Sequence, residues 1–421
     1  MRVMKKHVPL KIFLSILGIL LLVVLFFVGR AMIHQREPEN YGSYVFEDHK
    51  SSFSLDLFAS QNLYIESDAE TLRVMQIADP QIKFGFMTHD TKTMDLLSRA
   101  IEAQKPHICV VTGDLTMSLF TYDAYKFFAD FMEERKQYWT LTFGNHDLEF
   151  DCSAYTLAKL LSDYEYCLFD VGPSDVKGKS NFLVNVYRGE ETVPSYSLIM
   201  LDSGMYPEGG GGLSWIYDSF DQSQLDFYEW AVKGLKEIND GVIIKSSLFF
   251  HIPIQEHAKM YYASKGECIG DDVYLPVREV AGTVCENDKD PNECVDEGYT
   301  VGIYYQGENT GLYDLAASLG STTSMFVGHD HANTLRGYYG DIYLGYGLCA
   351  GYHTYPLFEK SNFLTDLLGV SDDIYFNQQM WKDENGVPYE KGVSMIEISI
   401  DKDSDDYGSL TVEFKFESDL K

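Results

Sequence analysis

The chain has 421 residues, of which 45% are hydrophobic and 14% aromatic, so its composition is that of a folded protein and excludes a disordered one. It has 33 Lys and Arg residues against 64 Asp and Glu residues, which gives a net charge of −31 at pH 7. Because so acidic a surface repels a phosphate backbone, we expect no nucleic-acid partner.

The first 36 residues differ from the rest of the chain. An apolar run at 12–29 has about the minimum length of one membrane-spanning helix. Basic residues are more frequent before this run than just after it, which favours an N-terminus inside the cell and a body outside. A cleaved signal peptide is the alternative, but no clear small-x-small cleavage site is present. We therefore expect residues 1–36 to be a signal anchor of a single-pass membrane protein, with an extracytoplasmic domain at the cell surface that is secreted if the segment is cleaved.

The seven cysteines suggest at most a few disulfides. Cys285 and Cys294 flank a polar loop and could pair in an oxidising compartment. Cys152 with Cys167 is a weaker candidate pair. The odd number leaves at least one thiol unpaired.

Residues 37–70 are polar and mixed, and indicate a stalk that leads into one domain at 71–421. Apolar runs that alternate with helical patterns predict an α/β fold with a largely internal sheet. The chain should end in a β-hairpin. The predicted strands are 72–78, 107–112, 138–143, 196–201, 247–250, 324–327, 341–346, 394–400 and 409–417, and the predicted helices are 91–104, with Thr91 or Thr93 as N-cap, and 122–135.

Five of the predicted strands end in side chains that can bind metals. These side chains are Asp79 and Gln81, then Asp114, then Asn145 with His146 and Asp147, then His251, and finally His329 with His331. In an α/β sheet the ligand site lies outside the carboxyl ends of the strands, so these loops can converge on one place. A single histidine after a strand is usually an ordinary loop or core residue. The same arrangement at five strand ends favours a common site.

The donor types in these loops indicate the chemistry. Carboxylate, amide and imidazole donors suit divalent manganese, iron, zinc or magnesium. Seven ligands are too many for one ion, whereas two ions that share one aspartate would each have four and leave room for water. Such a pair of ions is used to hydrolyse phosphate esters.

The order of these motifs resembles the calcineurin-like metallophosphoesterase superfamily, whose pattern is D-x-H, G-D, G-N-H-[DE], H and G-H-x-H. Further similarity, in the segments LDSG, QSQLDFYEW and FFHIP, points to the purple-acid-phosphatase-29/Dcr2-like branch. The resemblance implies a four-layer α/β/β/α sandwich with two mixed β-sheets, preceded here by one N-terminal transmembrane helix.

The resemblance also implies a role for each motif residue. Asp79, Gln81, Asp114 and His331 would hold the first metal ion, and Asp114, Asn145, His251 and His329 the second, with Asp114 as the bridge. His146 would contact the substrate phosphate and protonate the leaving oxygen or stabilise the transition state. Asp147 would orient His146 through a hydrogen bond.

Two positions depart from the family pattern. Gln81 stands where most members have histidine, and its amide oxygen is a harder and weaker ligand, which favours manganese, magnesium or iron in the first site. Met117 stands where the purple enzymes carry a tyrosine ligand, so the charge-transfer colour of those enzymes should be absent.

Other polar residues near the motifs have simpler interpretations. Asp330 should point away from the metals, because its neighbours on both sides point inward. His353 lines the pocket or is a plain loop residue, and His89 and His257 are expected at the surface.

These observations predict a membrane-anchored, dinuclear metal-dependent phosphoesterase that hydrolyses phosphomonoesters or phosphodiesters by metal-activated hydroxide. Its substrate would be a small phosphorylated molecule or a phosphoester-bearing macromolecule. The alternative is a catalytically weak cell-surface binding protein that retains the fold.

Overall fold

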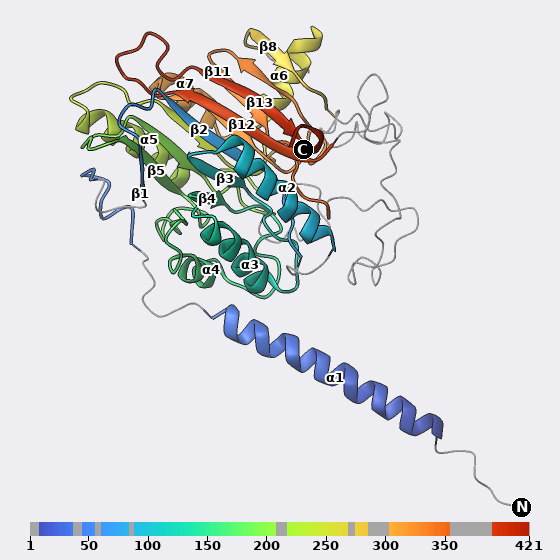
Figure 1. Ribbon diagram of the computed structural model, residues 1–421. Coiled ribbons are helices and arrows are strands. Elements are labelled where there is room, and N and C mark those ends of the chain that lie inside the picture. The colour runs from blue at the N-terminus through green and yellow to red at the C-terminus, as the bar shows by residue number, and fades with distance from the viewer. Residues whose placement is uncertain are drawn as a thin grey trace, which may run out of the picture.

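A computed structural model shows one long apolar helix followed by a globular part built on two β-sheets (Figure 1). It describes residues 8–36, 44–54, 60–83, 88–207, 217–267, 274–284, 303–353 and 390–420.

The smaller sheet has five strands in the order β13-β12-β2-β3-β4. β2, β3 and β4 are parallel, and β12 is antiparallel to both β2 and β13, so the sheet is mixed. The hairpin predicted at the end of the chain is β12 with β13. The strands are β2 Thr71–Ile77, β3 Ile108–Thr112, β4 Trp139–Thr142, β12 Gly392–Ser399 and β13 Leu410–Phe416.

The larger sheet has eight strands in the order β1-β5-β6-β7-β9-β11-β10-β8. Its centre, from β6 to β11, is parallel, and antiparallel pairs flank this centre on both sides. The strands are β1 Ser60–Ile65, β5 Phe182–Arg188, β6 Tyr196–Met200, β7 Ser246–Phe249, β8 Val277–Ala281, β9 Thr322–Val327, β10 Arg336–Tyr339 and β11 Ile342–Tyr346.

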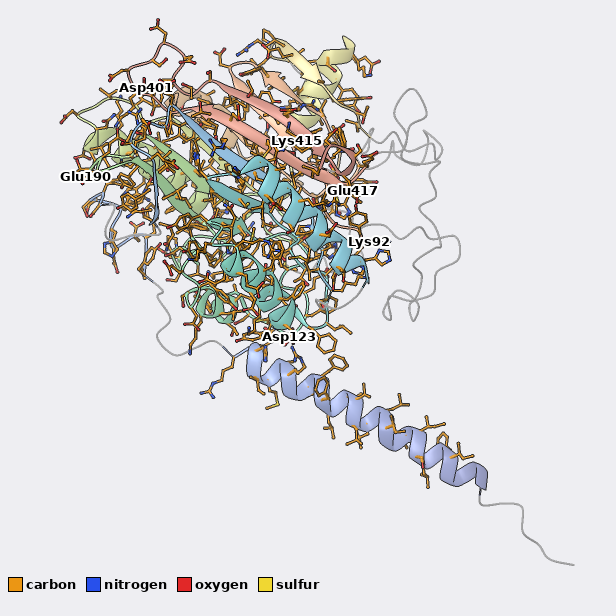
Figure 2. The ribbon with its side chains drawn as sticks, viewed as in Figure 1. Lys92, Asp123, Glu190, Asp401, Lys415 and Glu417 are labelled. Carbon is orange, nitrogen blue, oxygen red and sulfur yellow. The ribbon has the colours of Figure 1, made fainter. Side chains whose placement is uncertain are left out.

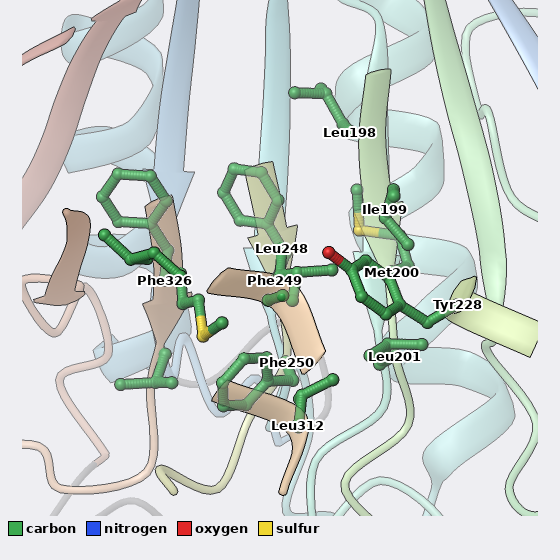
Figure 3. Close-up of a cluster of buried hydrophobic side chains, with 14 of the residues drawn as sticks. Leu198, Ile199, Met200, Leu201, Tyr228, Leu248, Phe249, Phe250, Leu312 and Phe326 are labelled. Carbon is green, nitrogen blue, oxygen red and sulfur yellow. The ribbon is translucent and has the colours of Figure 1, made fainter. Parts of the chain in front are cut away.

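Helices cover the outer face of each sheet. Along β3, Ile108 and Val110 join the core shared with the larger sheet, while Cys109 and Val111 join the cluster under the helices, as the two-residue period of a strand requires. Figure 3 shows the core of the larger sheet, where Tyr228 and Leu312 pack against strand residues such as Phe249. The helices of the smaller sheet are α2 Thr88–Gln104, α3 Thr121–Glu134 and α4 Ala154–Leu161, and those of the larger sheet are α5 Gln222–Ile238, α6 Gln255–Lys265 and α7 Leu312–Leu319. The predicted sandwich of two mixed sheets between helical layers is confirmed.

The N-terminal helix α1 spans Val8–His34. Its segment Ile12–His34 has a mean hydropathy of 3.1, and its apolar side chains from Ile12 to Phe26 are exposed. By length and composition, this segment is able to cross a membrane.

The expected stalk at 37–70 is wrong for much of its length. β1 is an edge strand of the larger sheet, paired in parallel with β5, and Phe46 is buried against Phe227 and Trp230. The polar sequence of this segment gives little sign that it belongs to the sheet, because an edge strand with one solvent-exposed face carries few apolar residues.

The predicted start of the first helix is also wrong. α2 begins at Thr88, ahead of Thr91 and Thr93. The hydroxyl of Thr93 is buried and accepts a hydrogen bond from the backbone of Tyr352 at 3.2 Å. Thr93 therefore links the helix to the loop that carries Tyr352 instead of capping the helix.

Candidate metal centre

The structure brings all seven predicted ligands into one cluster at the carboxyl ends of the strands. The side chains of Asp79, Asp114 and His251 offer donor atoms that all lie within 4.8 Å of one another, and all three are buried. The other four predicted ligands, Gln81, Asn145, His329 and His331, contact these three. The expected convergence of five loops is therefore present, while the role of each residue as a ligand stays a prediction.

His251 shows most clearly that the cluster requires a cation. Its Nδ1 lies 2.8 Å from the carbonyl oxygen of Thr112, which can only accept a hydrogen bond, so Nδ1 carries a proton. In the neutral ring, Nε2 therefore carries a lone pair, and it faces Asn145 Oδ1 at 3.1 Å and Asp114 Oδ1 at 3.4 Å. Three acceptors converge there, and either a proton or a metal ion has to lie between them.

The contacts divide the cluster into the two groups that the sequence predicts. His331 Nε2 lies 3.2 Å from Asp79 Oδ1 and 3.3 Å from the amide of Gln81. His329 Nδ1 lies 3.3 Å from His251 Nε2. Asp114 contacts both groups, because its Oδ2 accepts a hydrogen bond from Gln81 at 3.4 Å while its Oδ1 faces His251. A flip of the Gln81 amide would turn its oxygen to the same place.

The charges agree with a cation site. Burial lowers the pKa of His251, but the carboxylates of Asp114 and Asp79 outweigh burial and raise that pKa to about 10. The imidazole thus holds a proton because negative charge is in excess around it. Divalent ions would neutralise the same charge and displace this proton. The donor set and its charge therefore fit two metal ions.

The backbone of the site is strained in a way that the sequence does not reveal. Asp79, Gln81, Asp114 and His329 all have positive φ, between 44° and 75°. They make up half of the eight residues other than glycine with this conformation in the described part of the chain. Such backbone is uncommon and tends to gather at functional sites.

Two motif glycines are required by close packing. Gly113 has a φ of +79°, and a Cβ atom there would lie 2.4 Å from His251 Nδ1. A Cβ atom at Gly144 would lie 2.3 Å from Asp114 Oδ1. These contacts explain why glycine directly precedes both Asp114 and Asn145.

His146 lies beside this cluster and is partly exposed, but its partner is not the expected one. Its Nε2 is 3.9 Å from Asp114 Oδ2, and its Nδ1 is 2.9 Å from Glu149 Oε2. Asp147 instead accepts hydrogen bonds from the backbone amides of Thr116, at 3.0 Å, and Gly144, at 2.8 Å. The expectation that Asp147 orients His146 is therefore wrong: Asp147 fixes two loops, and Glu149 contacts the histidine.

These different surroundings affect the pKa values of His146 and Asp147. Burial lowers the pKa of His146, while Asp114 and Glu149 raise it, with the result that it stands at about 9. Burial and the charge of Asp114 raise the pKa of Asp147 to about 7. Glu149 thus favours the protonated ring, which is the form that can donate a proton.

Two tyrosines next to the cluster have no motif signal in the sequence. The ring of Tyr217 meets that of His329 edge-on with centroids 4.4 Å apart. Tyr206 stacks on Tyr217 at 5.8 Å, and its hydroxyl hydrogen-bonds the side chain of Asn145. They come from the segment after β6, where the sequence offers only aromatic composition as a clue.

The remaining predicted residues occupy clear places. Asp330 points away from the metal cluster, as expected, and accepts hydrogen bonds from the Tyr346 hydroxyl at 2.7 Å and the Tyr304 amide at 3.1 Å. His353 is buried against Asp90, with Nε2 at 2.9 Å from Oδ1.

The expected surface position of His257 is wrong, because its side chain is fully buried and burial lowers its pKa to about 3. The weaker candidate disulfide is also wrong: Cys152 and Cys167 are both free thiols. Cys285 and Cys294 lie outside the described residues.

Comparison with known proteins agrees with the motif order. A sequence model described as calcineurin-like phosphoesterase matches residues 72–282. The chain therefore belongs to the calcineurin-like phosphoesterase family.

Individual relatives confirm the expected branch. The chain is 24% identical to "Probable inactive purple acid phosphatase 28" of Arabidopsis thaliana over 81% of its own length and 83% of that protein. It is 27% identical to "Phosphatase DCR2" of Saccharomyces cerevisiae over 49% of its own length and 39% of that protein. Among solved structures, a dimetal phosphatase from Danio rerio matches with 12% identity and a TM-score of 0.39, covering 66% of this chain and 88% of that one.

Proposed function

We propose that this chain is a membrane-anchored phosphoesterase that binds two divalent ions and hydrolyses phosphomonoesters or phosphodiesters. The observation that carries the proposal is the convergence of His251 Nε2, Asn145 Oδ1 and Asp114 Oδ1 on one place, where a proton or a metal ion can lie between them. Asp79, Gln81, Asp114 and His331 would hold one ion, and Asp114, Asn145, His251 and His329 the other. When bound, such ions supply Lewis-acid activation of water and neutralise charge on the phosphate.

The protein's own groups have the remaining tasks. Nε2 of His146 would donate a proton to the leaving oxygen, because the ring is partly exposed beside the cluster. Glu149 would hold that ring in place through Nδ1. Tyr217 would support His329 from the side, and the buried Asp147 would keep the loops of Asp114 and Asn145 in register.

The anchor is part of the proposal. The last residues of α1 hold specific contacts with the globular part, among them an ion pair from Arg30 to Asp151 at 2.8 Å. A segment that is cut off after export has no reason to keep such contacts, so they favour an uncleaved anchor.

A second candidate is a binding protein with little turnover, because the name of the Arabidopsis relative includes the words "probable inactive". The complete donor set and the position of His146 favour an enzyme. Both candidates bind metal, so metal content alone does not separate them.

The test uses the full-length protein in detergent with added Mn²⁺. We expect hydrolysis of a chromogenic phosphomonoester or the matching diester, together with bound metal measured by mass spectrometry. Asp114→Asn should lose both metal and activity, the latter by at least about 100-fold, since even loss of a residue behind a ligand costs 10- to 100-fold. Asp330→Asn, a matched change of a carboxylate that points away from the cluster, should keep both. If metal is bound but neither ester is hydrolysed, the enzyme proposal is wrong and the binding protein is the remaining candidate.

A further inference from the structure

We propose that the metal centre works at the membrane surface, on phosphoester headgroups of lipids in the same bilayer that holds α1. This inference rests on the proposed function, including the anchor, and adds a substrate class to it. Its basis is the way in which the end of α1 is joined to the loops that carry the site.

The first observation is an ion-pair clamp at the end of α1. Arg30 Nη2 lies 2.5 Å from Asp123 Oδ2 and 2.8 Å from Asp151 Oδ2. The side chains of Arg30 and Asp151 are only 17% and 6% exposed, so water screens this pair weakly. Asp151 also accepts a hydrogen bond from the backbone amide of Thr121 at 2.9 Å. Figure 2 shows Asp123 at the place where the globular part meets α1.

The clamp continues through backbone and ring contacts. Ser153 donates its backbone N–H to the carbonyl oxygen of His34 at 3.0 Å, and Gln35 donates its side-chain amide to the carbonyl oxygen of Phe150 at 2.5 Å. The rings of Phe27 and Phe120 lie 5.7 Å apart. These contacts fix the rotation and the distance of the helix end, which a single ion pair would not do.

The clamped segments are the continuations of two site loops. The loop after β3 carries Asp114 and leads to Phe120, and the loop after β4 carries His146 and leads to Asp151. Asp151 is four positions after Asp147, so their Cα atoms are at most about 14 Å apart. The site motif that holds Asp147 is therefore within about 14 Å of the residue whose carboxylate pairs with Arg30. Figure 1 shows α3 and α4 beside the end of α1.

The depth of this end in a membrane follows from α1 itself. The apolar run ends at Gly29, and Arg30 is the first charged residue after it. A charged residue at such an end lies in the headgroup layer, which is about 5 to 8 Å thick on each side of the hydrocarbon. Phe27 lies one turn deeper, so its contact with Phe120 places that loop at the edge of the hydrocarbon.

Exposed apolar side chains occur in the same two loops. Met117, three residues after Asp114, is 40% exposed, and Phe150, three residues after Asp147, is 37% exposed. Scattered exposed apolar residues are ordinary, but these two lie in the clamped loops. Apolar side chains suit the boundary between headgroups and acyl chains.

At this depth, the phosphoesters that reach the site without leaving the bilayer are those of lipid headgroups. A phosphorylated protein would have to lower a loop into the headgroup layer. In the hydrolysis of a lipid monophosphate, the ester P–O bond breaks, the oxygen of water joins phosphorus, and the leaving lipid oxygen takes a proton. Inorganic phosphate and a neutral lipid alcohol result.

The test uses the full-length protein reconstituted in vesicles with Mn²⁺. The monoester probes are long-chain phosphatidic acid in the same vesicles as the protein, the same lipid in separate vesicles, and a water-soluble short-chain phosphatidic acid. Phosphatidylglycerol is supplied in the same three forms to test whether the protein prefers a diester. We expect the lipid in the same vesicle to be hydrolysed at least about tenfold faster than the lipid in separate vesicles, because sharing a bilayer raises its effective concentration.

The outcomes separate the two proposals. This inference is wrong if the short-chain ester is hydrolysed but the lipid in the same vesicle is not. It is also wrong if lipid in the same vesicle and lipid in separate vesicles are hydrolysed at equal rates. In both cases the proposed phosphoesterase activity would stand. No hydrolysis of any probe or chromogenic ester, with metal bound, would overturn the proposed function itself.

A variant pair checks the surface directly. Phe150→Ser should slow hydrolysis of the lipid in the same vesicle severalfold and leave the short-chain rate unchanged. Val242→Ser is the matched control: Val242 is 62% exposed but precedes β7, at the opposite end of that strand from His251. An equal effect of both changes, or none from Phe150→Ser, would contradict a membrane-facing site.

Discussion

Glu149 is the residue that contacts His146, the proposed proton donor. Its carboxylate lies 2.9 Å from His146 Nδ1, and the two residues are three apart in the chain. A contact at Nδ1 helps to fix the orientation of the ring, and a proton donor works only when it is aimed at the leaving oxygen. Glu149 is therefore assigned as a positioning residue.

Replacing Glu149 by alanine tests this assignment. We expect kcat to fall by about tenfold, less than the about 100- to 10,000-fold that loss of general acid catalysis itself costs, because the imidazole remains. KM and metal content should stay near their original values. The measurement is steady-state hydrolysis of the chromogenic ester with the metal content of the same sample.

Two further variants separate positioning from simple damage. Glu149→Gln keeps an oxygen acceptor that can lie at the same place beside Nδ1, so it should recover much of the lost rate. Asp147→Asn should behave differently, with lower stability and lower metal content, because Asp147 bridges the backbone of Thr116 and Gly144. If Glu149→Ala also loses metal, the residue supports the fold and does not aim the histidine.

At the scale of elements, the site depends on strands that end in glycine turns. Gly113 follows β3, and its left-handed backbone lets the chain pass beside the ring of His251. A side chain there meets both a backbone penalty and a direct overlap. The position of the turn thus determines how closely β3 and β7 bring their ligands together.

Gly113→Ala should destabilise the protein by more than the about 1 to 2 kcal/mol that left-handed backbone alone costs. Its new Cβ would lie 2.4 Å from His251 Nδ1, so His251 must move and metal content should fall. Gly241→Ala is the matched control, since Gly241 has a φ of +83° and nothing within 4 Å of its added Cβ. Urea unfolding and metal analysis compare the two. Equal destabilisation with full metal content in both variants would contradict the close packing.

The elements also show what the sequence could predict. Strands such as β2, β3 and β9 are visible because each is a short apolar run that stops at a polar motif residue. β1 was missed because its residues are largely polar, and the helices α4 to α7 were missed beside conspicuous strand motifs. The ligands were predictable as residue types at strand ends. Glu149, Tyr206 and Tyr217 were not, because only the folded loops bring them to the site.

For the whole molecule, the main correction is where the globular part begins. The segment at 44–54 lies on α5. Phe46 packs against Phe227 and Trp230, and the ring of Phe53 is tilted against that of Trp230 with centroids 4.8 Å apart. β1 then extends the larger sheet beyond β5. The described segments between α1 and the first site motif are therefore largely part of the fold.

Phe46→Ala tests this boundary in the full-length protein. Phe46 is 3% exposed, so its truncation should lower the free energy of unfolding by about 3 to 5 kcal/mol, the usual cost of removing a buried phenyl ring. Its neighbour Val45 is 38% exposed, so Val45→Ala should change stability by less than about 0.5 kcal/mol. Chemical unfolding of the detergent-solubilised variants measures both. If Phe46→Ala is as stable as Val45→Ala, the segment is a loose stalk after all, and the domain begins only near β2, where the sequence alone placed it.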